Sequence, residues 1–154
     1  PSEIGKFLDS NDIEKIAKSL KNQKDIYIIG RGFAYPVARE IALKLKEIPY
    51  VHAEGMMGGE LKHGTLALIE KGTPVIALTP ENDHDIISNV KEVEARGARV
   101  ISIGNNDIEI NTSNDAAFAV LSIIAGQLLA YYIAKEKGLP IDKPRNLAKC
   151  VSVK

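Results

Sequence analysis

Short apolar runs rich in β-branched residues alternate along this 154-residue chain with segments whose apolar residues recur at helical spacing. The runs at 25–29, 75–78 and 99–103 have the length and composition of buried strands. The segments at 36–48 and 86–93 place apolar side chains three and four residues apart, as an amphipathic helix does. Strands and helices in alternation form βαβ units. We therefore expect a doubly wound α/β fold, a three-layer αβα sandwich with a mostly parallel, flavodoxin-like sheet of about five strands.

Proline, glycine and capping residues set the boundaries that we expect for these elements. Pro36 opens the first helix and Pro49 ends it, whereas Asp85 caps the second helix and Gly97 ends it. The other expected elements are an amphipathic helix at 12–21, short strands at 50–52 and 108–110, and a helical stretch at 61–69. In such a fold the ligand binds beyond the carboxyl ends of the strands.

The composition argues against several classes of protein. Twenty Lys and Arg residues against 20 Asp and Glu leave no net charge, whereas binding to a phosphate backbone needs an excess of cations. The single cysteine, Cys150, has no disulfide partner, which favours a reducing, cytoplasmic location. His52, His63 and His84 do not stand at a spacing typical of metal ligands. We therefore expect no nucleic-acid partner and no metal.

The segment at 116–134 is apolar except for Ser122, Gly126 and Gln127. About 20 apolar residues also span a membrane, but the rest of the chain has no membrane-like character. We favour a helix that is apolar on all sides and is covered on more than one of them. This interpretation requires a partner surface, either a second subunit or a further domain. The lack of an initiating Met also predicts that the chain is a piece of a longer protein.

Glu40, Lys44 and Glu47 stand at i, i+4 and i+7 and therefore share one face of the first helix. Such triplets are most often solvated ladders of ion pairs. The functional alternative is that a carboxylate moves a proton while the neighbouring ammonium tunes it, as in an aldose–ketose isomerase. The spacing permits both interpretations.

Two other features leave alternatives open. The glycines of Gly30-Arg31-Gly32 resemble the start of a nucleotide-binding fingerprint, with Glu54 after the next strand, but Tyr35 stands where its third glycine belongs. A strand-to-helix turn that needs backbone freedom explains the glycines more simply. His63 near a turn is by itself more typical of a surface residue than of a catalytic one.

Five ordered segments carry a more specific signal. They are Gly-Arg-Gly-Phe-Ala-Tyr-Pro at 30–36, Leu-Lys-Leu-Lys-Glu-Ile at 43–48, His-Ala-Glu-Gly at 52–55, Gly-Glu-Leu-Lys-His-Gly at 59–64 and Pro-Arg-Asn-Leu-Ala-Lys at 144–149. Together they resemble the second sugar-isomerase (SIS) domain of the glucosamine-6-phosphate synthase family, the glutamine:fructose-6-phosphate amidotransferases. The resemblance covers about residues 25–154. It implies a single SIS domain at 1–154, with a leading helix in 1–24, an α/β core at 25–143 and a tail at 144–154 that closes on the active site.

The resemblance also implies roles for single residues. Glu47 matches the base that moves a proton between C1 and C2 of the open-chain sugar, and Lys149 matches the amine that forms an imine with fructose 6-phosphate. Lys44 matches a residue that polarises the substrate. An imine-forming lysine must be neutral to attack, so its pKa has to fall, through burial or through a nearby cation such as Lys44.

Three further roles follow from the same resemblance. Glu40 and Ala148 match substrate-binding positions, and His63 matches the ring-opening histidine that a neighbouring subunit supplies. A homodimer is therefore expected. The resemblance implies no cofactor and no metal.

The chain departs from the family pattern in places. Thr65 replaces a proline and Cys150 replaces a serine, and neither touches the implied chemistry. The Ser/Thr-rich loop that holds the sugar phosphate in the first SIS domain has no equivalent, because the corresponding loop at 79–83 carries two acidic residues that repel phosphate. The cysteine nucleophile of the glutaminase domain is also missing. Two functions remain open: half of a sugar-phosphate isomerase site, completed by the missing domains, or a non-catalytic sugar-phosphate-binding or dimerisation module.

Overall fold

The computed structural model describes residues 2–10, 12–81 and 83–147. Its helices are α1 (Ser2–Ser10), α2 (Ile13–Leu20), α3 (Ala34–Glu47), α4 (His84–Glu94) and α5 (Asp115–Glu136), with two 3₁₀ helices, η1 (Gly58–His63) and η2 (Thr65–Leu68). Its strands are β1 (Asp25–Gly30), β2 (His52–Met57), β3 (Pro74–Leu78), β4 (Arg99–Gly104) and β5 (Ile108–Glu109). Strands and helices alternate from β1 onward, as the hydrophobic periodicity predicts.

The five strands form one sheet in the order β2-β1-β3-β4-β5, and every neighbouring pair is parallel. All five residues of β3 are buried, since strands lie on both sides of it and helices cover both faces. The strand order reverses between β1 and β3, which is the switch point of a doubly wound sheet. The expected fold class is confirmed.

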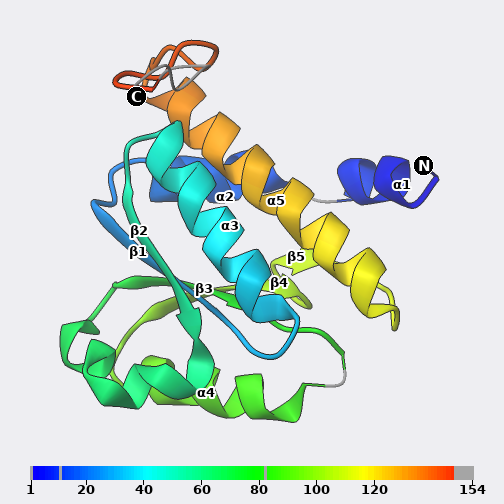
Figure 1. The fold of residues 1–154 in the computed structure, drawn as a ribbon, viewed down its shortest axis with the longest axis vertical. Helices are drawn as coiled ribbons and strands as arrows, with labels where there is room; N and C mark the ends of the chain where they lie inside the picture. The colour runs from blue at the N-terminus through cyan, green and yellow to red at the C-terminus, as the bar shows by residue number, and fades with distance from the viewer. Residues whose placement is uncertain (1, 11, 82, 148–154) are drawn as a thin grey trace, which may run out of the picture.

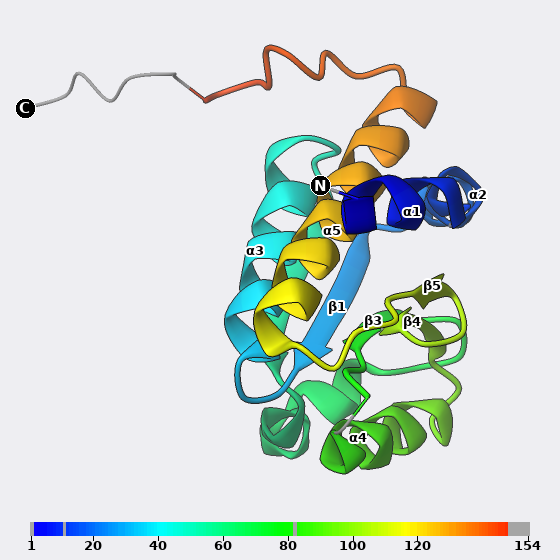
Figure 2. The ribbon, with the colours of Figure 1, turned by 90° about the vertical axis from the view of Figure 1, so that its right-hand side faces the viewer.

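Three layers are visible in Figures 1 and 2. Helices α2, α3 and α5 cover one face of the sheet, and their apolar side chains form the larger hydrophobic cluster with Ile28, Ile76 and Ile101. Helix α4 and the two 3₁₀ helices cover the other face, around Ile29 and Val75. Alternate residues of β1 and β3 therefore enter opposite clusters, as the pleat of a strand requires.

Two glycines allow α3 to lie tightly against the sheet. A Cβ on Gly30, at the end of β1, would stand 2.6 Å from the carbonyl oxygen of Ala34. A Cβ on Gly55, in β2, would stand 2.5 Å from the carbonyl oxygen of Ala38. The close approach at Gly30 supports the turn interpretation of the Gly30-Arg-Gly segment, because the glycine makes room for the first turn of α3.

Helix α5 is a core helix of the domain. Of the described helices, α5 alone has the length and the apolar composition to cross a membrane. The buried core helix of a soluble protein can have the same length and composition. One face of it is buried against α2, α3 and the sheet, and the buried residues are Phe118, Leu121, Ser122, Ala125, Gly126, Leu129, Ala130, Ile133 and Ala134. Its outer face is partly exposed, with Val120 at 51% and Tyr131 at 42%. The sequence predicted that this helix is covered on more than one side, and in the structure of the single chain the rest of the domain covers its inner side only.

Several expected boundaries are wrong. Helix α3 begins at Ala34 rather than at Pro36. Pro36 lies inside the first turn, where a helix tolerates proline. The second strand is β2 at 52–57 rather than 50–52, because Tyr50 adopts a positive φ that breaks an extended backbone. Asp83, not Asp85, caps α4, since its side chain accepts the N–H of Ile86. Two short 3₁₀ helices replace the expected helix at 61–69, and α1 was not expected.

Candidate active site

The ionisable triplet of α3 forms a connected cluster. Lys44 Nζ donates to Glu47 Oε2 at 2.7 Å and lies 3.5 Å from Glu40 Oε1. The side chain of Lys44 is 24% exposed, and those of Glu40 and Glu47 are 39% and 31% exposed. Apolar residues of the same helix are buried beneath them, so the helix holds the three charged groups at the edge of the core. One ammonium thus bridges two carboxylates, as the shared helix face predicts.

The hydrogen bond to Glu47 raises the pKa of Lys44 above its ordinary value, with a smaller contribution from Glu40, while burial opposes both. Because the folded pKa is raised, the stabilisation by this cluster is present below the ordinary lysine pKa and is lost as the pH rises through the folded value.

We expect Glu47→Gln to lower the pKa of Lys44 more than Glu40→Gln does, since the Glu47 contact is shorter. A titration of the Lys44 ¹³Cε chemical shift measures both, and equal shifts would contradict the geometry.

An open depression of about 470 Å³ lies at the carboxyl end of α3. Glu47, Tyr50 and the segment at 145–147 are among the residues that line it. The backbone N–H of Arg145 donates to the Tyr50 hydroxyl at 2.8 Å, and the Arg145 guanidinium lies 4.3 Å from the centre of the Tyr50 ring. The segment that precedes Lys149 is therefore attached beside Glu47.

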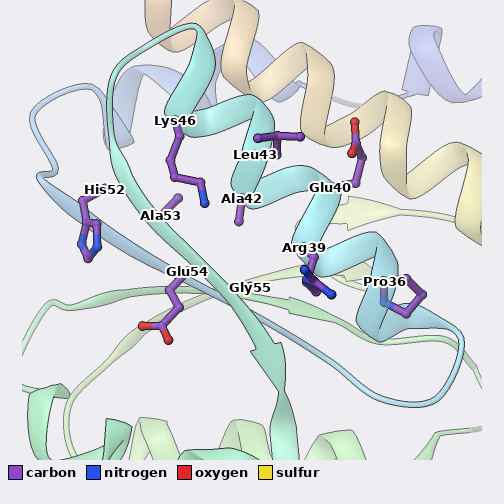
Figure 3. Close-up of a pocket in the computed structure, with 10 residues that line it drawn as sticks. All are labelled: Pro36, Arg39, Glu40, Ala42, Leu43, Lys46, His52, Ala53, Glu54 and Gly55. Atoms are coloured by element: carbon purple, nitrogen blue, oxygen red, sulfur yellow. The ribbon is translucent and has the colours of Figure 1, made fainter. Parts of the chain in front are cut away.

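A second groove, of about 520 Å³, follows the other side of α3 along the edge strand β2 (Figure 3). Arg39 and Lys46 reach from the helix toward the strand, from which Glu54 and His52 project (Figure 3). Glu40 also lines this groove, although its carboxylate is directed away from the strand (Figure 3). The groove and the depression beside Glu47 adjoin, because Lys46 and His52 line both.

His63 is the last residue of η1 and lies beyond the carboxyl end of β2. Its Nδ1 is 2.8 Å from Glu60 Oε2, and its side chain is 72% exposed. Because a carboxylate only accepts hydrogen bonds, Nδ1 donates in this pair, and Nε2 takes no part in it. Glu47 lies at the opposite end of β2, a strand of six residues that spans roughly 20 Å. A single chain therefore does not bring His63 to Glu47.

The carboxyl edge of the sheet holds a smaller cavity of about 280 Å³ at the switch point between β1 and β3. Arg31, Glu81 and Asp83 are among its lining residues. Arg31 is paired with Asp85 at 3.0 Å, and Asp83 occupies the amino end of α4 as its cap. Over the described residues, no group of three or more Asp, Glu, His or Cys side chains is placed to hold a metal ion.

The model of the SIS domain family matches residues 19–134, which is most of the chain. The chain belongs to the SIS domain family. The expected resemblance to an SIS domain is therefore confirmed.

Two curated relatives of this SIS domain are each named glutamine–fructose-6-phosphate aminotransferase (isomerizing). The protein of Clostridium acetobutylicum is 47% identical over 99% of this chain, and that of Lactiplantibacillus plantarum is 52% identical over 91%. The matches cover 28% and 25% of those proteins. The chain thus spans about a quarter of the length of the curated relatives that it matches.

Solved structures resemble this SIS domain over nearly its whole length. One is the C-terminal domain of glucosamine-fructose-6-phosphate aminotransferase from Francisella tularensis, with a TM-score of 0.82 and 37% identity over 92% of this chain and 44% of that one. Another is glucosamine-6-phosphate deaminase from Thermotoga maritima, with a TM-score of 0.78 and 30% identity over 95% of this chain and 46% of that one.

The residues expected at the site of this SIS domain fall into three groups. Glu40, Lys44 and Glu47 are brought together on α3, while His63 lies at the other end of β2. Ala148 and Lys149, like the rest of the tail from 148 to 154, lie outside the described residues. The sequence analysis placed the ligand beyond the carboxyl ends of the strands. Glu47 instead lies beside the start of β2, at the amino edge of the sheet.

Sequence reasoning missed three residues that contact the expected site residues or lie beside them. Tyr50 was assigned to a strand, and Arg145 was noted only as part of a motif, although the two contact each other beside Glu47. Glu60, which orients His63, was also missed. The signal available for Glu60 is its position three residues before His63, since residues i and i+3 of a 3₁₀ helix lie above one another.

Proposed function

We propose that this SIS domain is half of a sugar-phosphate isomerase site that converts fructose 6-phosphate toward glucosamine 6-phosphate. The observation that carries the proposal is the α3 cluster, in which the Lys44 ammonium holds the Glu47 carboxylate at 2.7 Å. The names of the relatives support fructose 6-phosphate as the substrate. The single cysteine supports a cytoplasmic location.

In the proposed mechanism Lys149 Nζ attacks the C2 carbonyl of the open-chain ketose and water leaves, which forms an imine. Ammonia, which the missing glutaminase domain would supply, then displaces Lys149 Nζ and leaves an imine of ammonia at C2. Glu47 removes a proton from C1, and the electron pair of that C–H bond forms the C1–C2 double bond while the imine nitrogen takes up the displaced electron pair. Glu47 returns the proton to C2 as the C1 hydroxyl gives up its proton to water, which leaves an aldehyde at C1 and an amine at C2. Lys44 keeps the carboxylate in place throughout, and Glu40 and Ala148 contact the sugar. His63 opens the sugar ring in the site of a second subunit, through the Nε2 atom that Glu60 leaves free.

The proposed imine can be tested directly. Incubation of the chain with fructose 6-phosphate and borohydride is expected to give a covalent adduct, because hydride reduces the imine to a stable secondary amine. We expect peptide mapping to locate the adduct at Lys149, and we expect it to vanish in Lys149→Ala but to persist in Lys143→Ala, the matched lysine of the same segment. An adduct at another lysine, or none in the wild type, would contradict the isomerase proposal for this chain.

A second candidate is a non-catalytic sugar-phosphate-binding or dimerisation module. It is favoured by the loop after β3, where Asp83 caps α4 with its own carboxylate and Glu81 adds a second negative charge at the same cavity. A phosphate would meet both charges there. Absence of the borohydride adduct, together with a stable dimer, would favour this module.

We propose a second copy of the chain as the partner of the outer face of α5. Val120 and Tyr131 on α5 and Leu43 on the neighbouring α3 are each more than 40% exposed. We expect light scattering over a concentration series to detect a dimer, and Val120→Glu to raise its Kd at least ten-fold, about 1.4 kcal/mol, by placing a charge in the interface. Leu68→Glu, on the other side of the sheet, should leave the Kd unchanged. A monomer at all concentrations would refute the proposal.

A further inference from the structure

Tyr50 lies in the turn between α3 and β2 and has a backbone conformation that residues other than glycine rarely adopt. Its φ is +56°, in the left-handed region. Among the described residues, the other non-glycine positions with positive φ are Asn106 and Asn146, and asparagine tolerates this conformation better than a bulky aromatic residue does. A strained residue persists where the surrounding contacts determine it, which makes its contacts worth tracing.

The contacts of Tyr50 lead to a segment 95 residues away in the sequence. Its hydroxyl accepts the backbone N–H of Arg145 at 2.8 Å, and its ring lies 4.3 Å below the Arg145 guanidinium. A main-chain hydrogen bond and a cation–π contact therefore act on the same residue. The first fixes the backbone of the segment and the second fixes its side chain.

The same turn is attached to the end of α5. Lys137, the C-cap of α5, donates from Nζ to the carbonyl oxygen of Pro49 at 2.9 Å. The segment from Lys137 to Arg145 is thus bound at both ends to the turn Pro49-Tyr50. This turn also lies at the rim of the depression that Glu47 lines.

Chain geometry gives the consequence for Lys149. From Lys137 alone, about 12 residues of tail would let its Cα reach roughly 40 Å away, whereas from Arg145 about four residues limit this distance to roughly 14 Å. A three-fold shorter tether raises the local concentration about five-fold for a random coil and about 30-fold for an extended chain. The contact with Tyr50 therefore shortens about three-fold the length of chain that joins residue 149 to the depression that Glu47 lines.

We propose that Tyr50 is a positioning residue that anchors the segment at 145–147 beside Glu47 through Arg145, and so limits how far the chain that follows it can range from the Glu47 depression. The effect of Tyr50 on the sugar imine rests on the proposed function. The contact between Tyr50 and Arg145 does not rest on that function, because it is a property of the folded chain. Tyr50 acts through Arg145 and Lys149 and has no chemical role of its own.

The anchor can be tested without substrate. Amide exchange by NMR is expected to show protection of the Arg145 N–H, which Tyr50→Phe accelerates at least ten-fold by removing the acceptor oxygen. A nitroxide on Cys150, the single cysteine, should broaden the Glu47 amide signal, and Tyr50→Ala should reduce this paramagnetic effect about five-fold or more. Tyr35, whose ring lies 5.9 Å from the Arg39 guanidinium at the other end of α3, provides the matched Phe and Ala variants, which should change neither measurement.

The same variants then enter the borohydride reaction. We expect Tyr50→Ala to form the Lys149 adduct about five- to 30-fold more slowly and Tyr50→Phe to lie between it and the wild type, with thermal unfolding confirming that both variants fold. A wild-type Arg145 amide that exchanges as in a free peptide would overturn the anchor. An unchanged nitroxide effect in folded Tyr50→Ala would overturn the positioning role. If the wild type forms no adduct, the proposed function fails, and the two NMR measurements still decide the inference.

Discussion

Glu47→Gln is expected to slow the exchange of the C1 proton of fructose 6-phosphate by about 10²–10⁴-fold, the usual contribution of a general base. The amide keeps the size of the side chain and can still accept from Lys44, but it has no lone pair basic enough to remove a proton from carbon. Incorporation of deuterium from D₂O into the sugar, followed by NMR, measures this step separately from product release.

Two controls separate base catalysis from simple loss of charge. Glu40→Gln removes the weaker of the two contacts to Lys44, at 3.5 Å, and should raise KM more than it lowers kcat. Lys91→Met, in the last turn of α4 on the other face of the sheet, should leave exchange unchanged. Deuterium incorporation at the wild-type rate in Glu47→Gln would show that another group is the base. The borohydride adduct should survive in this variant, since imine formation does not need the C1 proton to leave.

Gly55→Ala is expected to destabilise the domain strongly. The added Cβ would stand 2.5 Å from the carbonyl oxygen of Ala38 and 2.6 Å from the Cα of Arg39, and both are backbone atoms that move only with the whole helix. Such overpacking costs about 3 kcal/mol, which corresponds to a fall in Tm of about 6–12 °C for a domain of this size. Thermal unfolding followed by circular dichroism measures the change.

Gly59→Ala is the matched control for this substitution. A Cβ on Gly59 would meet its nearest neighbour, an Arg31 nitrogen, at 3.6 Å, which is an ordinary contact. Its Tm should change by no more than about 2 °C. If Gly55→Ala unfolds at the same temperature as Gly59→Ala, β2 and α3 are less tightly packed than described. Because α3 carries Glu40, Lys44 and Glu47, a partly folded Gly55→Ala protein should also lose the raised pKa of Lys44.

Local patterns accounted for much of the fold. Runs such as 75–78 are apolar at every position, which favours burial on both faces, and the alternation with helices favours the centre of a parallel sheet as the place where they are buried. The face shared by Glu40, Lys44 and Glu47 follows from the pitch of a helix alone, and their contacts agree with it. Both features depend on residues within a few positions of each other.

The segments whose structure was predicted wrongly are those in which the local sequence has only a weak preference for strand or helix. The segment 52–57 has two methionines and a glycine and no β-branched residue, so its strand character arises from pairing with β1 over all six residues. Tyr50 and Val51 resemble a strand by composition, yet Tyr50 turns the chain. In the same way, no apolar periodicity indicates the 3₁₀ helix at Gly58–His63, although Glu60 and His63 have the i, i+3 spacing that brings side chains together on such a helix.

The amino-acid sequence was sufficient for the order of strands and helices, the parallel sheet and the shared face of the α3 cluster, because each of these depends on short-range periodicity and burial. The resemblance supplied the roles of Glu47 and Lys149, which no local pattern contains. The attachment of Arg145 to Tyr50 emerged from the folded chain alone. The distance between His63 and Glu47 within one chain also required the structure, although the resemblance had assigned His63 to the site of a neighbouring subunit. Both depend on where segments far apart in the sequence meet, and that is determined by packing against the common core.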